Sequence, residues 1–109
     1  MKRYILLLAV VALVAAAPAG AMTGSLTGTV GPGFTISMAK KTVKAGKYKI
    51  VVSDKASIHD FHLSGPGVNK ATSVSGTGTA TWTVTLRKGT YKFRCDPHAS
   101  SMHGTLKVT

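Results

Sequence analysis

The chain has 109 residues, the size of a single domain, and carries 14 Lys and Arg against only three Asp and Glu. Its formal net charge of +11 at neutral pH favours contact with anionic surfaces and acidic proteins. Nucleic acid is a poor match, because the basic residues do not interleave with aromatic residues and form no recognised binding motif. The single cysteine excludes an internal disulfide.

The first 21 residues have the pattern of a secretory signal peptide. Lys2 and Arg3 precede the apolar run Ile5 to Ala17, which is too short to cross a bilayer and is followed by small residues up to Ala21. We therefore expect residues 1–21 to be removed on export and residues 22–109 to form an extracytoplasmic domain, periplasmic, secreted or associated with the cell envelope. An uncleaved membrane anchor is the alternative. Without Lys2 and Arg3, the chain has twelve basic residues and three aspartates, so the expected mature domain has a net charge of +9.

The remaining sequence predicts an all-β domain. Apolar residues alternate with Thr, Lys and Ser between turns rich in Gly and Pro, and no helical spacing of apolar residues is sustained over ten positions. Short strands of this kind, with regular turn signals, are typical of an antiparallel β-sandwich or barrel. A loop is expected from Gly65 to Gly78. The expected strands cover residues 26–30, 34–38, 48–52, 58–63, 82–86, 91–95 and 106–108.

The most informative residues lie on a short segment after the strand expected at 91–95. Cys95, His98 and Met102 offer a thiolate, an imidazole and a thioether within eight residues, and Pro97 stiffens the link between the first two. His59, further upstream, supplies a second imidazole. Two His, one Cys and a weak axial Met make up the ligand set of a blue-copper site. A metal bond would also protect a lone thiol outside the cytosol.

These residues resemble a known family. The pattern Y-x-F-x-C-x-P-H-x-x-x-M-x-G, with H-D-F upstream, is similar to the cupredoxins, and most of all to the small plastocyanin/pseudoazurin-like copper proteins of bacteria. The resemblance covers Gly24 to Thr109. It implies a Greek-key antiparallel β-sandwich with one copper ion that alternates between Cu(I) and Cu(II). It also implies His59, Cys95 and His98 as equatorial ligands and Met102 as the axial ligand.

Two of these assignments have neighbouring rivals. His62 competes with His59; strand alternation would turn His59 inward with Phe61 and His62 towards solvent. His103 competes with Met102, and a site with His103 as a ligand would suit zinc in a structural domain. The family pattern favours His59 and Met102.

The chain departs from the family at two positions near the ligands. Asp60 follows the first His, where Asn is usual, and Asp96 follows the Cys, where Ser or Thr is frequent. Either the two carboxyls lie together and share a proton, or Asp60 accepts a backbone N–H from the Cys loop while Asp96 points to solvent.

The sequence therefore predicts an exported, monomeric electron-transfer protein rather than an enzyme. Its expected partner is a redox protein with an acidic surface, the anionic cell envelope is a second expected contact, and nucleic acid is not expected. The alternative function is that of a copper carrier or buffer without a dedicated redox partner.

Overall fold

The computed structural model describes residues 21–109. The signal peptide expected at residues 1–21 therefore lies, apart from its last residue, outside the described residues. Within residues 21–109, no helix is long and apolar enough to cross a membrane.

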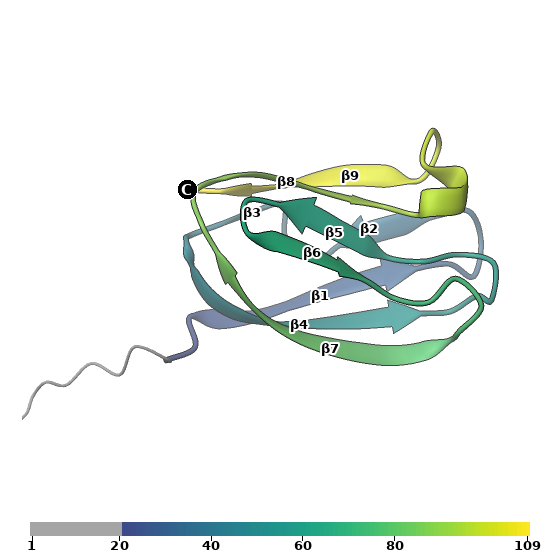
Figure 1. The fold of residues 1–109 in the computed structure, drawn as a ribbon, viewed down its shortest axis with the longest axis horizontal. Helices are drawn as coiled ribbons and strands as arrows, with labels where there is room; N and C mark the ends of the chain where they lie inside the picture. Colours follow the sequence, from purple (N-terminus) through teal and green to yellow (C-terminus); the bar gives the residue numbers. More distant parts are fainter. Residues whose placement is uncertain (1–20) are drawn as a thin grey trace, which may run out of the picture.

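The described residues form two β-sheets packed face to face (Figure 1). The first sheet has the order β2-β1-β4-β7 and the second the order β3-β9-β8-β5-β6. The strands are β1 (Gly24–Val30), β2 (Ile36–Met38), β3 (Thr42–Val43), β4 (Gly46–Asp54), β5 (His62–Gly65), β6 (Val68–Ala71), β7 (Gly78–Leu86), β8 (Gly89–Arg94) and β9 (His103–Val108). One 3₁₀ turn, η2 (Asp96–His98), follows β8. The all-β sandwich predicted from the sequence is confirmed, with two parallel pairs, β1–β4 and β3–β9, among antiparallel ones.

Alternating apolar residues fill the space between the sheets. Along β4, Tyr48, Ile50 and Val52 are buried, and on the facing sheet Tyr91 and Phe93 are buried in β8. Every second residue is buried because successive side chains of a strand point to opposite faces, and only one face of each strand points into the sandwich. Trp82 is partly buried and packs against this core.

Three expectations about strand positions were wrong. Residues 58–61 are not a strand; β5 begins only at His62, and the segment before it is a loop. Phe34 lies outside β2 and is 62% exposed, because the turn after β1 extends to it. The segment expected as a loop contains the strand β6, in which only Val68 is buried, so that it has no alternating apolar signal. The two-residue strand β3 is too short to have been predicted.

The strands run lengthwise between two opposite ends of the sandwich. β4 ends at Asp54 and β8 ends at Arg94 at one end, which also carries η2. β1 begins at Gly24 at the other end, where the chain's C-terminus also lies (Figure 1). We call the end with η2 the metal pole, because the metal-ligating side chains gather there.

Candidate metal centre

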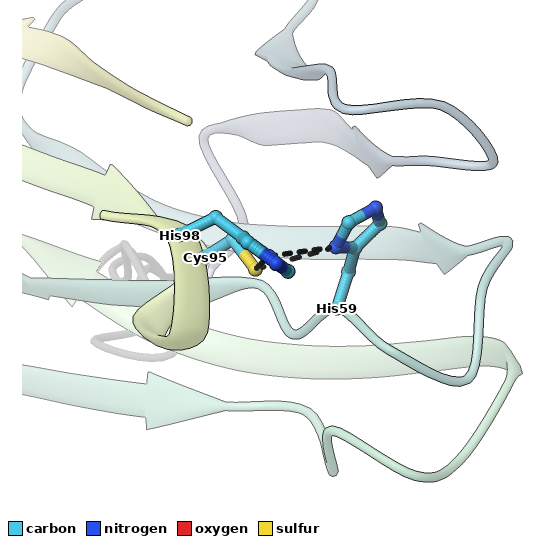
Figure 2. Close-up of side chains that lie close together, drawn as sticks. All are labelled: His59, Cys95 and His98. Carbon is cyan, nitrogen blue, oxygen red and sulfur yellow. Dashed lines mark hydrogen bonds between the residues drawn. The ribbon is translucent and has the colours of Figure 1, made fainter. Parts of the chain in front are cut away.

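Three side chains from two separate segments converge at the metal pole. Cys95 directly follows β8, His98 ends η2, and His59 comes from the loop between β4 and β5 (Figure 2). The Cys95 sulfur lies 3.6 Å from His59 Nδ1 and 3.5 Å from His98 Nδ1, and the two Nδ1 atoms are 3.2 Å apart. Three soft or borderline donors therefore form a nearly equilateral triangle.

The size of this triangle fits a first-row metal ion. The centre of an equilateral triangle lies one edge divided by √3 from each corner, which for these edges is about 2 Å, close to the lengths of metal–imidazole and metal–thiolate bonds. Cys95 and His59 are fully buried, so a bound ion would be shielded from water. Burial also raises the pKa of the Cys95 thiol. The donor set of two imidazoles and one thiol favours copper or zinc over Mg²⁺ or Ca²⁺.

Backbone hydrogen bonds close the loop that carries Cys95 and His98. His98 N–H donates to Cys95 C=O at 3.0 Å, Met102 N–H donates to His98 C=O at 2.8 Å, and Cys95 N–H donates to Met102 C=O at 3.0 Å. These hydrogen bonds join the two ends of the loop and place Met102 beside Cys95. The Met102 side chain is buried, whereas its rival His103 is exposed in β9 and is not among the clustered donors.

A second set of hydrogen bonds holds the loop that carries His59. The buried Asp54 accepts hydrogen bonds from Ala56 N–H at 3.2 Å and from the Thr72 hydroxyl at 3.0 Å. The same Thr72 oxygen accepts the N–H of Phe61 at 2.9 Å, and Thr72 N–H donates to Phe61 C=O at 3.1 Å. The loop is thus fixed on both sides of His59. No local sequence pattern points to Thr72, because its partners are distant along the chain.

Asp60 connects the two ligand-bearing loops. Its carboxyl accepts the backbone N–H of Asp96 at 2.6 Å. Burial, followed by the nearby Asp96 carboxyl, raises the pKa of Asp60. The pKa of Asp96 is lowered to about 2, because hydrogen bonds with Asp60, His62 and Arg94 stabilise its charged form. Of the two arrangements left open by the sequence, the backbone N–H contact of Asp60 is present, but Asp96 does not point freely to solvent.

The expectation that His62 faces solvent was wrong. Its Nδ1 lies 2.9 Å from the Asp96 carboxylate, its Nε2 contacts the Asn69 side chain, and the side chain is only 17% exposed. The alternation argument failed because His59 and Asp60 precede β5 and are both buried. His62 nevertheless stays outside the cluster of His59, Cys95 and His98, as predicted.

Phe34 was missed as a residue of the site. Its ring meets the imidazoles of His59 and His98 edge-on, with centroid distances of 5.1 and 4.9 Å. The turn that delivers it contains Gly31 at φ 74°, where a Cβ would approach His59 and Ala56 closely. The glycine and proline before Phe34 were the available signal that the strand does not start there.

Comparison with known proteins identifies the family. Residues 23–109 match the family of copper-binding proteins of the plastocyanin/azurin type. The chain belongs to this family. No curated protein matches the chain. Among solved structures, reduced rusticyanin is similar with a TM-score of 0.60 and 21% identity over 78% of each chain. A Cu(I) form of an amicyanin variant is similar with a TM-score of 0.57 and 16% identity, over 78% of this chain and 82% of that one.

The family and the donor geometry together specify the metal. A cupredoxin fold with two imidazoles and a thiol in one buried triangle, and a buried methionine on the same loop, is consistent with one type 1 copper site. The cupredoxin fold predicted from the sequence motif is confirmed by rusticyanin and amicyanin.

Proposed function

We propose that this cupredoxin carries single electrons between redox proteins and is not itself an enzyme. His59, Cys95 and His98 would hold the copper ion equatorially and Met102 axially. The observation that carries the proposal is the closely spaced triangle of two Nδ1 atoms and one sulfur. When bound, copper supplies one-electron exchange between Cu(I) and Cu(II).

The protein's own residues supply the rigidity that fast exchange needs. The hydrogen bonds among Cys95, His98 and Met102 fix one loop, and the Asp54–Thr72 pair fixes the other. Donors that are held in place change position little between the two oxidation states, so little reorganisation accompanies electron transfer. A site built only to store copper has no need of this constraint.

A partner protein would make contact at the metal pole. Phe34 is 62% exposed while its ring touches both imidazoles, and Ile58, next to His59, is 51% exposed. Exposed apolar residues beside the metal ligands offer a short path for an electron and a contact from which a partner protein can exclude water. The positive charge of the domain would increase the encounter rate with an acidic redox protein.

The electron-transfer proposal is tested by the self-exchange rate between oxidised and reduced protein, measured by line broadening in NMR spectra. Fast exchange with a reversible potential is expected. The alternative is a copper carrier or buffer without a dedicated redox partner. Slow self-exchange, together with copper that transfers readily to a competing chelator, would favour that alternative.

A further inference from the structure

Charge is distributed unevenly between the two ends of the molecule. All three acidic residues of the chain, Asp54, Asp60 and Asp96, lie at the metal pole. The opposite end holds a group of basic residues in the turns between β2, β3 and β4, at the start of β4 and between β7 and β8. We call this group the basic pole: Lys40, Lys41, Lys44, Lys47, Arg87 and Lys88.

The charge at the basic pole is not offset by ion pairs. Both ion pairs found within residues 21–109, His62–Asp96 and Arg94–Asp96, are at the metal pole. Five of the six basic-pole residues are exposed and Lys47 is partly exposed, so the group presents a net charge of about +6 to solvent.

The N-terminal segment joins the domain at this same end. Thr23 N–H donates to Lys47 C=O at 2.7 Å, and Thr23 and Gly24 line the same hollow as Lys40 and Lys44. The 20 residues that precede the described structure include the apolar run Ile5 to Ala17. The apolar run is therefore joined to the domain at the end that carries the basic pole.

We propose that the basic pole binds the surface of a bilayer that contains anionic phospholipids and turns the metal centre away from that surface. Lysine and arginine side chains near an anionic membrane each contribute to binding through its negative surface potential. The nine residues of β4 separate the two poles by roughly 30 Å. A domain seated on its basic pole would therefore present Phe34 and His98 to the aqueous side.

A redox partner is a poorer occupant of the basic pole. Electron transfer weakens steeply with distance, and a partner seated there would be separated from the Cys95–His59–His98 triangle by the length of the sandwich. The proposed lipid contact is independent of electron transfer and holds even if the copper site serves storage.

The direct test compares binding of the purified protein to vesicles of phosphatidylcholine alone and of equal parts phosphatidylcholine and phosphatidylglycerol. The measured quantity is the ratio of the two dissociation constants, compared between the wild type and its variants, which all carry the same N-terminal segment with Lys2 and Arg3. The triple variant Lys40→Glu, Lys44→Glu, Lys88→Glu should bind anionic vesicles roughly a hundredfold more weakly, because three membrane-facing cations are lost. Added salt should weaken wild-type binding as well.

The matched control reverses three charges outside the basic pole. Lys55 follows β4 at the metal pole, and Lys70 and Lys92 lie within β6 and β8. The variant Lys55→Glu, Lys70→Glu, Lys92→Glu has the same net charge as the basic-pole variant and should keep most of the preference for anionic vesicles. Equal losses in both variants, or no preference of the wild type for anionic vesicles, would overturn the proposal.

Orientation is tested without copper, by dyes on single cysteines in a Cys95→Ser background. A polarity-sensitive dye on Ala45→Cys, in the turn between β3 and β4, should shift its emission to the blue on anionic vesicles. The same dye on Ser100→Cys, in the loop after η2, should not respond. A larger shift at position 100 than at position 45 would mean that the metal pole faces the membrane.

Discussion

The carboxyl of Asp60 accepts a hydrogen bond from the backbone N–H of Asp96 at 2.6 Å, although the two residues are 36 positions apart. Asp60 follows one proposed ligand, His59, and Asp96 follows another, Cys95. This bond therefore holds together the two loops whose side chains form the metal centre. It also explains how an aspartate can stand where a neutral amide is usual in the family, since an oxygen acceptor is all that the contact requires.

Removing this acceptor should destabilise the protein. Asp60→Ala leaves the N–H of Asp96 without its partner, and an unsatisfied buried group of this kind costs about 1–3 kcal/mol. Asp60→Asn keeps an oxygen acceptor and ends the like-charge conflict with Asp96, so it should cost much less. Chemical denaturation of the metal-free protein measures both. Equal losses for the two variants would show that the hydrogen bond is not what Asp60 contributes.

Thr72 should matter for the position of His59 although it does not contact the metal centre. Thr72→Val removes the hydroxyl shared by Asp54 and Phe61 and should lower the free energy of unfolding by about 1–3 kcal/mol. Copper affinity should fall as well, because the His59 loop loses one of its two fixed sides. Thr81→Val, at an exposed position in β7, is the control and should change neither quantity.

The axial assignment predicts different effects at two neighbouring residues. Met102→Leu should keep the intense colour of the Cu(II) protein but raise its reduction potential, because a weak donor that favours Cu(II) is lost. His103→Ala should change neither, since His103 is exposed and outside the cluster. Visible spectra and voltammetry decide the matter. A larger spectral change in His103→Ala than in Met102→Leu would make the assignment of Met102 wrong.

His62 predicts a pH dependence of stability. Burial alone lowers the pKa of His62, but its hydrogen bonds with Asn69 and Asp96 outweigh burial and raise the pKa above its usual value. The contribution of protonated His62 should thus be complete below about pH 6.5 and be lost as the pH rises through the higher folded-state pKa. The unfolding free energy of the metal-free wild type, minus that of His62→Gln, should fall over this range. A constant difference for His62→Gln would contradict the ion pair.

The sequence predicted the metal-binding side chains better than it predicted the residues that hold them in place. Cys95, His98 and Met102 lie on one short loop, so their spacing alone carries the information. His59 was found through the family motif, while the alternation argument for it relied on a strand that does not exist before His62.

The residues that hold these side chains in place act through contacts between segments that are distant along the chain. Thr72 contacts Asp54 across 18 positions, and Phe34 contacts His98 from the turn between β1 and β2. Thr72 has no distinguishing local pattern, and the Gly31-Pro32-Gly33 turn before Phe34 indicates a turn but not a contact with the ligands. The separation of charge between the poles likewise appears only when the strands are arranged in space, because Lys44 and Lys88 are far apart in sequence.

The most direct test of the type 1 copper assignment is the visible and paramagnetic-resonance spectrum of the protein loaded with one equivalent of Cu(II). We expect an intense thiolate-to-copper charge-transfer band near the red end of the visible range and a narrow copper hyperfine splitting. Both should disappear in Cys95→Ser, because an alcohol is a poor soft ligand. A wild-type protein that binds Cu(II) but stays colourless, with the broad splitting of an ordinary copper complex, would contradict the assignment.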